Sequence, residues 1–166
     1  MNISKEKNKK LCWICKARIN PFMSFGKMPI ANNFLPKEDF DKEYFFEMEP
    51  AFCSECHMFQ LINQPEPEQM FNEDYAFFSG TSEYMKTHFK NFSQYVLENV
   101  GKDPFIVEIG SNDGIMLQNF AKKNIRHIGV EPSKNVAEVA KKKGINTLID
   151  FFNKETAKKI VREEGK

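Results

Sequence analysis

The sequence has almost no net charge: its basic and acidic residues nearly balance, leaving a formal charge of +1 at pH 7. Nucleic acids and anionic membrane surfaces attract proteins with excess positive charge, so we expect neither as a partner. The sequence also lacks a run of roughly 18 apolar residues, the length that a membrane-spanning helix needs. No apolar stretch follows the basic residues 1–10, so they are predicted to be a disordered tail rather than a signal peptide. These absences predict a cytoplasmic protein.

Cysteine is scarce, and the four cysteines form two C-x-x-C pairs, Cys12 with Cys15 and Cys53 with Cys56. In a reducing compartment such pairs favour metal over disulfide. Each pair can place two thiolates on one side of a tight turn, and two turns complete the tetrahedral shell of a structural zinc ion. The alternative is free thiols or a redox pair. We predict a zinc-binding module with four cysteine ligands over residues 11–68.

The second pair also belongs to the string C-S-E-C-H, residues 53–57, which has the spacing of covalent c-type haem attachment. Haem is attached in exported proteins, and this interpretation leaves the first pair without a role. We therefore expect His57 to be a neighbour of the zinc site and not a ligand.

The insert between the pairs is rich in phenylalanine. A small module cannot bury many large rings by itself, so some are expected to pack on the rest of the protein or to line a substrate cleft. The rings are Phe22, Phe25, Phe34, Phe40, Phe45 and Phe46.

A boundary is expected at residues 63–68, N-Q-P-E-P-E, where prolines interrupt the apolar pattern. An aromatic loop with hydroxyl side chains follows at residues 74–82, D-Y-A-F-F-S-G-T-S. Apolar residues then recur at helical spacing from Met85 to Val100, behind a cap at Thr81 or Ser82. Residues 69–100 are thus predicted to form an aromatic loop and a connecting helix whose apolar stripe belongs to the core.

Residues 105–132 predict the first βαβ unit of a doubly wound nucleotide-binding sheet. The strand Phe105–Ile109 enters a turn with two glycines, the helix Ile115–Phe120 follows, and a second strand, Ile128–Val130, ends at Glu131. A capped helix from Ser133, a third strand at Thr147–Ile149 and a last helix capped by Asn153 and running through Val161 continue the alternation. The predicted fold class is therefore α/β, a small zinc module followed by half of a Rossmann-like sheet over residues 101–166.

Three strands leave the first strand as an open, hydrophobic edge in the usual strand order. We therefore expect this chain to be a fragment of a longer enzyme, needing the remainder of its own chain, or else a partner, to cover that edge.

The turn E-I-G-S-N-D-G, residues 108–114, is not the G-x-G-x-x-G of dinucleotide sites. Gly110 permits a sharp turn and close approach of a ligand, Asn112 tolerates a left-handed conformation, and Gly114 opens the helix. Asp113 would repel a pyrophosphate, but it suits S-adenosylmethionine (SAM), which carries a cationic amino group and sulfonium and no phosphate. In the same prediction Glu131 accepts the two ribose hydroxyls.

The predicted cofactor-binding residues lie where the three strands end. Among them, Asp150 and Phe151 supply an acid and a ring for an adenine. The full set is Glu108, Gly110, Ser111, Asn112, Asp113, Gly114, Glu131, Pro132, Asp150 and Phe151.

Several blocks, in order, resemble the nucleotide-sugar C-methyltransferases of deoxysugar biosynthesis. They include C-W-I-C, G-K-M-P-I-A-N-N-F-L, C-S-E-C-H-M-F-Q-L, D-Y-A-F-F-S-G-T-S, V-E-I-G-S-N-D-G-I-M-L-Q and G-V-E-P-S-K-N-V-A-E-V-A-K-K-K-G-I, and span residues 11–152. The resemblance implies structural zinc on the four cysteines and SAM at residues 108–114 with Glu131. It also implies a further Rossmann-like domain, with the catalytic histidines beyond residue 166.

The substrate that the resemblance implies is a dTDP-linked 4-keto-deoxysugar, methylated on a carbon beside the ketone through an enolate. Tyr75 is the one residue here expected on the sugar side, as a hydrogen-bond donor. Two other functions stay open: an NAD-dependent oxidoreductase, disfavoured by the missing central glycine, and a non-catalytic zinc-ribbon module that binds a protein partner.

Overall fold

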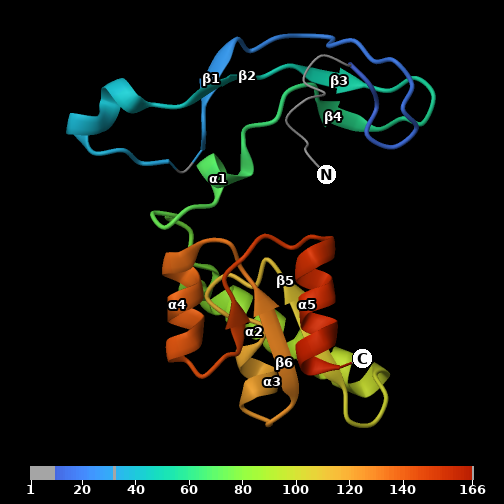
Figure 1. The fold of residues 1–166 in the computed structure, drawn as a ribbon, viewed down its shortest axis with the longest axis vertical. Coiled ribbons are helices and arrows are strands. Elements are labelled where there is room, and N and C mark those ends of the chain that lie inside the picture. The colour runs from blue at the N-terminus through green and yellow to red at the C-terminus, as the bar shows by residue number, and fades with distance from the viewer. Residues whose placement is uncertain (1–9, 32, 166) are drawn as a thin grey trace. The chain divides into compact units, whose positions relative to one another are not determined.

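A computed structural model describes residues 10–31 and 33–165 (Figure 1). The chain divides into two compact units, Met1–Met70 and Phe71–Lys166. Apart from Lys10, the predicted disordered tail lies outside the described residues. Across the described ranges, every helix is too short or too polar to cross a membrane.

The N-terminal unit is built from short antiparallel strands. β1 pairs with β2, and β3 pairs with β4 so that Phe52 lies opposite Phe59. Each of these four strands is three residues long. In chain order the elements are β1 (Lys27–Pro29), the 3-10 helix η2 (Lys37–Lys42), β2 (Phe45–Glu47), β3 (Pro50–Phe52), β4 (Phe59–Leu61) and α1 (Pro67–Met70).

The core of this unit is small, and two of its four buried members are cysteines: Cys12 and Cys53 lie with Ile19 and Ala51. A β-bridge from Pro21 to Ala51 ties the segment after the first C-x-x-C pair to β3. A core of this size stabilises a domain only weakly, so a metal crosslink is the natural supplement.

The phenylalanines of the insert are not part of this core. Five of the six rings are exposed, by between 51% and 80%, and Phe46 is half-buried. The exposed rings are those of Phe22, Phe25, Phe34, Phe40 and Phe45. Their packing on another part of the protein, or their place in a substrate cleft, stays a prediction.

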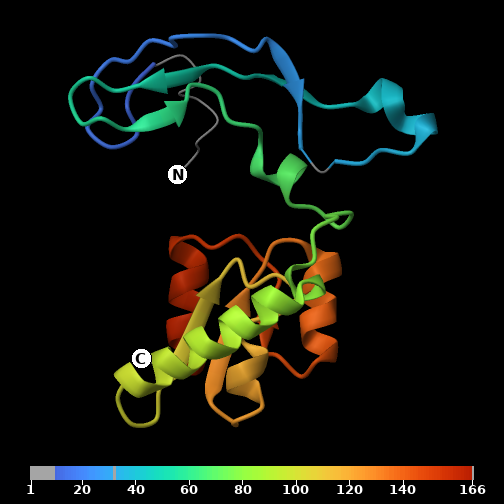
Figure 2. The same cartoon turned by 180° about the vertical axis from the view of Figure 1, so that it is seen from behind.

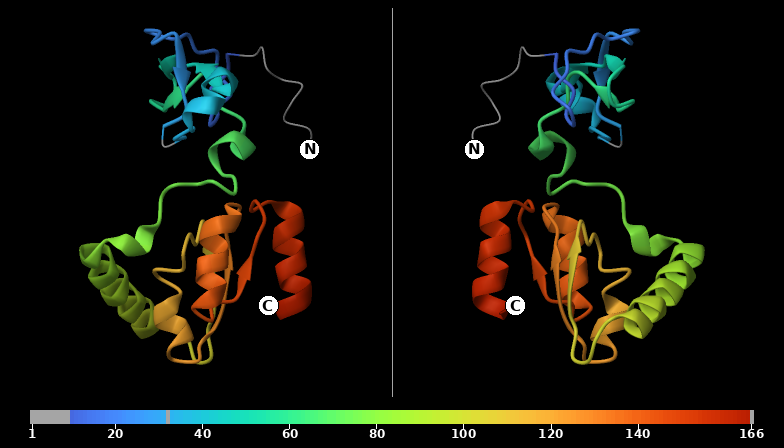
Figure 3. Two further views of the ribbon diagram at one scale, coloured as in Figure 1. Left: turned by 90° about the vertical axis from the view of Figure 1, so that its left-hand side faces the viewer. Right: turned by 90° about the vertical axis from the view of Figure 1, so that its right-hand side faces the viewer.

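The C-terminal unit is a parallel three-stranded sheet between two layers of helices (Figures 1 and 3). The strands are β5 (Phe105–Ile109), β6 (Arg126–Val130) and β7 (Thr147–Leu148), in the spatial order β5-β6-β7. The predicted α/β class with a parallel sheet is confirmed. Among the described strands, β5 pairs only with β6 and is an edge of the sheet.

Alternate residues of β5 enter different layers. Ile106 packs with Leu117 and Phe120 in a cluster that α2 (Glu83–Asn99), α3 (Gln118–Ala121) and α4 (Lys134–Lys142) share. Phe105 packs in a second cluster, with Ile128 and Val130 of β6 and with Ile160 of α5 (Lys154–Glu164). The sheet therefore has α2 and α3 on one face and α5 on the other (Figure 3).

Helix α2 only partly fulfils its prediction. Ser82 caps it, accepting the Met85 backbone N–H at 3.2 Å, and Val96 joins the core. Phe92 and Val100 of the predicted stripe are exposed, by 44% and 37%. Among the described elements, the backbone of α2 lies close to α3 and to the 3-10 helix η3 (Ser79–Thr81), which leaves part of the stripe uncovered (Figure 2).

The predicted helix from Ile115 to Phe120 is wrong at its start, because residues 115–117 form turns and α3 begins at Gln118. Gly114 has a φ of 76°, outside the helical region. The Ile115 carbonyl accepts side-chain amides of Gln118 and Asn119 instead of a helical backbone N–H.

Two further helix caps were predicted, and one of them is confirmed. Asn153 Oδ1 accepts the backbone N–H groups of Glu155 and Thr156, at 2.8 and 3.0 Å, at the start of α5. Ser133 occupies the N-cap position of α4, but its hydroxyl makes no capping bond, so that prediction is wrong for the side chain. The last helix ends at Glu164 rather than Val161, and the third strand ends one residue before Ile149.

Candidate metal centre and ligand-binding turn

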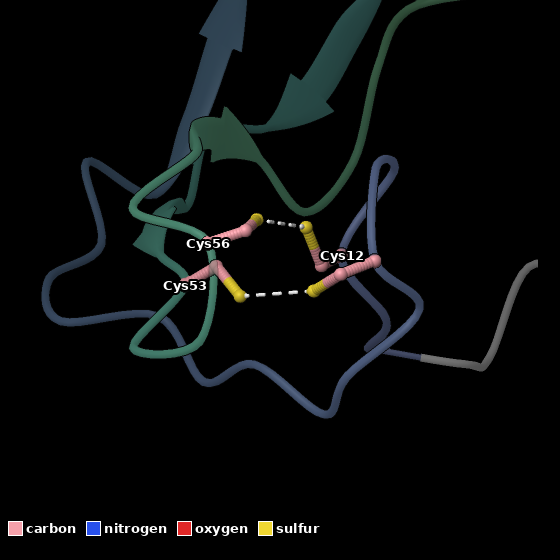
Figure 4. A group of neighbouring side chains, drawn as sticks. Cys12, Cys53 and Cys56 are labelled. Carbon is pink, nitrogen blue, oxygen red and sulfur yellow. Dashed lines mark hydrogen bonds between the residues drawn. The ribbon is translucent and has the colours of Figure 1, made fainter.

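The four cysteines meet in one cluster. Their Sγ atoms all lie within 4.8 Å of one another. Across the two turns, Cys12 Sγ lies 3.4 Å from Cys56 Sγ (Figure 4). Cys15 Sγ lies 3.5 Å from Cys53 Sγ. Four thiolates bonded to zinc at about 2.3 Å stand roughly 3.8 Å apart in a tetrahedron. The cluster can therefore hold a metal ion.

The two C-x-x-C turns have the same backbone. Lys16 N donates to Cys12 O at 3.0 Å, and His57 N donates to Cys53 O at 2.9 Å. The residue after each pair is left-handed, with φ 63° at Lys16 and 61° at His57. The two turns thus supply equivalent halves of the cluster, and His57 lies outside the group of potential ligands.

Substitution of Lys16 or His57 by glycine is expected to keep the metal, because each position needs a left-handed backbone rather than its own side chain. Removing the left-handed strain of a non-glycine residue should leave stability unchanged or raise it by about 1 kcal/mol. His57→Val is the control: a β-branched residue tolerates this conformation poorly and should be destabilising. Metal analysis and thermal unfolding measure both effects, and loss of zinc from His57→Gly would make the imidazole a ligand.

The four thiols of the cluster lie close enough to affect the ionisation of one another. Burial opposes the ionisation of Cys12, but the backbone amides of Cys15 and Ile14 and the neighbouring thiols outweigh it and lower its pKa to about 6. At Cys15 the Ala17 amide favours the thiolate, yet burial and the other thiols raise the pKa to about 12. Four thiolates can therefore coexist only beside a cation, which is the electrostatic requirement of a zinc site.

The second candidate site is the turn between β5 and α3. Gly110 and Asn112 are left-handed, with φ 71° and 50°. A Cβ added to Gly110 would meet nothing within 4 Å, so space lies open beside this backbone. At Gly114 the added Cβ would lie 2.1 Å from Ile145 Cδ1, so this glycine permits close packing on the segment after α4.

Glu131 is buried and already holds the turn together. Its Oε2 accepts the Asn112 N–H at 2.9 Å, and its Oε1 accepts the Ser133 N–H at 2.8 Å. The carboxylate thus ties the end of β5 to the start of α4. Its predicted contact with ribose hydroxyls stays a prediction, and sequence reasoning missed this internal role.

Several polar atoms beside the carboxyl ends of the strands are buried, and the described residues provide no hydrogen-bond partner for them. Such atoms are costly in a protein and are suited to contact a ligand. They are Glu108 Oε2, Ser111 Oγ, Ser133 Oγ and Asn135 Oδ1.

The other predicted residues lie at the same edge or next to it. Asp150 is exposed and Phe151 is half-buried after β7, and Pro132 is half-buried after Glu131. Tyr75 is half-buried, with its ring centroid 5.6 Å from that of Phe71. The parallel strands bring residues 108–114, 131–132 and 150–151 to one end of the sheet, where doubly wound folds bind ligands.

Burial, with a smaller effect from nearby Asp113 and Glu131, raises the pKa of Glu108 from 4.5 to about 8. Because the folded protein holds this proton more tightly, its stability should fall as pH rises from about 4.5 to 8. The expected loss is about 5 kcal/mol. Denaturant unfolding across this range should show it, and Glu108→Gln should remove it; an equal slope in the variant would contradict this.

Comparison with known proteins gives partial matches. Residues 12–71 match a family described as "Putative zinc binding domain". With the cysteine cluster, this match confirms the expectation of zinc. Over 146 residues the chain is 30% identical to "C-methyltransferase NovU" of Streptomyces niveus, covering 86% of this chain and 34% of the relative. The resemblance to C-methyltransferases is therefore confirmed, and the chain spans about a third of this relative.

Among solved structures, the chain is similar to the plantazolicin methyltransferase BpumL in complex with SAH. The match has a TM-score of 0.33 and 22% identity, and it covers 42% of this chain and 30% of that one. The same enzyme with a pentazolic desmethylPZN analog and SAH gives a TM-score of 0.34, 22% identity and coverage of 43% and 30%.

Proposed function

We propose that this chain is the zinc- and cofactor-binding part of a SAM-dependent C-methyltransferase acting on a nucleotide-linked 4-keto-deoxysugar. The observation that carries the proposal is the 30% identity over 146 residues to a protein named as a C-methyltransferase. A match of that length must include the second cysteine pair and the whole turn of residues 108–114. Because the chain covers 34% of that relative, the catalytic base and most of the sugar site are proposed to lie in the remainder of the protein.

The carboxyl edge of the sheet suits SAM. The open space beside Gly110 admits a ligand to the backbone, and Glu108 offers a carboxyl oxygen that the described residues leave without a partner. Glu108 would face the cationic amino group, while Asp150 and Phe151 would hold the adenine. When bound, SAM supplies an electrophilic methyl group.

In the proposed reaction a base removes the proton on the carbon beside the sugar ketone, and nearby donors stabilise the enolate oxygen. The enolate carbon then takes the methyl group, which releases S-adenosylhomocysteine (SAH). Tyr75 is proposed as a hydrogen-bond donor to the sugar. Its backbone is already fixed, because Asn135 Nδ2 donates to Tyr75 O at 2.7 Å.

The test incubates the native protein with SAM and a dTDP-linked 4-keto-deoxysugar, and follows the sugar by mass spectrometry. We expect a product heavier by one methylene unit and an equal amount of SAH. Turnover of NAD in place of SAM would overturn the proposal in favour of an oxidoreductase. Zinc binding without any nucleoside ligand or turnover would leave a non-catalytic module.

A further inference from the structure

Residues 75–81, here called the strap, are fastened to the ligand-binding turn by side chains of the turn itself. Asn112 bonds to the strap twice: its Nδ2 donates to Phe77 O at 3.0 Å, and its Oδ1 accepts the Ser79 N–H at 2.9 Å. Asp113 accepts the Gly80 N–H on both oxygens, at 3.2 and 3.1 Å. The two residues that follow Ser111 thus bind a segment distant in sequence.

The strap is held at the ends of two strands. Asn112 and Asp113 follow β5, whereas Asn135, which donates to Tyr75 O at 2.7 Å, lies in the first turn of α4 after β6. Since β5 and β6 are parallel neighbours, a segment bonded to both positions crosses the carboxyl edge of the sheet. The chain accordingly passes the end of α4 as it enters α2 (Figure 2).

Asp113 is itself held in place by Lys143. The residue is 4% exposed, and Lys143 Nζ, just beyond α4, donates to Asp113 Oδ2 at 3.2 Å and to Asp113 O at 2.8 Å. On the strap side the fit is tight, since a Cβ added to Gly80 would lie 2.4 Å from Asp113 Oδ2. A carboxylate fixed by a lysine on one side and by the Gly80 amide on the other has little freedom to approach a ligand.

We infer that Asp113, oriented by Lys143, is a positioning residue that fastens the strap across the carboxyl edge, and that it acts on the bound cofactor only through the strap. This deepens the proposed function and rests on it for the identity of the ligand. It also changes the role expected from the sequence, in which Asp113 faces SAM directly.

The fastening can be tested without ligand, by amide hydrogen exchange on the zinc-loaded protein. We expect the Gly80 amide to be protected in the native protein and to lose that protection in Asp113→Ala. Asp113→Asn, which retains one acceptor oxygen, should restore part of it. Equal Gly80 exchange in the native protein and Asp113→Ala would overturn the inference.

The action on the cofactor is tested by a double-mutant cycle with SAH as the probe. Asp113→Ala and Gly80→Ala should each weaken SAH binding about tenfold or more, the effect of losing a buried hydrogen bond to a charged group. The double variant should bind no more weakly than the weaker single variant, because both changes release the same strap. Losses that multiply would mean that Asp113 contacts the ligand directly, and would overturn the inference.

Two controls separate the strap from general damage. Gly101→Ala adds a Cβ where nothing lies within 4 Å, and should leave SAH affinity unchanged. Lys143→Met should weaken SAH binding and Gly80 protection together, whereas Lys142→Met, at the exposed neighbouring residue, should change neither. If the native protein does not bind SAH, the proposed function fails, while the exchange experiment still decides whether the strap is fastened.

Discussion

Cys53→Ser is expected to unfold the N-terminal unit and to abolish stoichiometric zinc binding. Cys53 is fully buried in a core of four residues, and its Sγ faces that of Cys15 at 3.5 Å. Structural zinc sites of this type contribute about 10–16 kcal/mol of apparent binding energy, far more than so small a core can replace. Metal analysis should fall from about one zinc per chain to none, and residues 10–70 should become sensitive to protease.

The control for this experiment is Ser54→Ala, an exposed change within the same turn that leaves all four thiols in place. It should retain zinc and protease resistance. We also expect the unit over residues 71–166 to stay folded in Cys53→Ser, because its two core clusters contain no residue of the N-terminal unit. A zinc-free but fully folded N-terminal unit would contradict the structural role of the metal.

Glu131→Ala is expected to destabilise the C-terminal unit and to abolish measurable SAH binding. The change leaves two N–H groups, of Asn112 and Ser133, without their acceptor in a buried site. Each unsatisfied group costs about 1–3 kcal/mol. Once released, the turn can no longer present Gly110 or hold the strap, so affinity should fall at least a hundredfold. Denaturant unfolding and SAH titration measure the two effects.

Glu131→Gln gives a graded comparison, since it keeps one carbonyl oxygen and loses the other acceptor. We expect it to lie between the native protein and Glu131→Ala in both stability and affinity. Glu138→Ala, on the exposed side of α4 beside Lys141, should change neither by more than about 0.5 kcal/mol. Native stability in Glu131→Ala would show that the two backbone bonds contribute little.

The sequence predicted the parts of the fold that follow from local chemistry. The left-handed residues Gly110 and Asn112 were recognisable because few residue types tolerate that conformation. The two C-x-x-C pairs were recognisable because zinc requires clustered thiolates, and the structure brings them together. The parallel sheet followed from apolar strands that alternate with helical segments.

What the sequence did not predict depends on contacts between distant residues. Lys143 pairs with Asp113, a residue far away in the sequence. Asn135 and Gly80 carried no local signal, because their importance lies in hydrogen bonds and close packing with residues far along the chain. The exposure of Phe92 could not be predicted either, because a helical stripe shows which residues lie on one face of the helix but not how much of that face other elements cover.

The most direct test of the central claim is calorimetric titration of the zinc-loaded protein with SAH, and separately with NAD. The account predicts one saturable SAH site per chain, lost in Glu131→Ala and retained in Glu138→Ala, and no binding of NAD. Binding of NAD without SAH, or SAH binding that survives Glu131→Ala unchanged, would contradict the assignment of the carboxyl edge of β5 and β6 as the cofactor site.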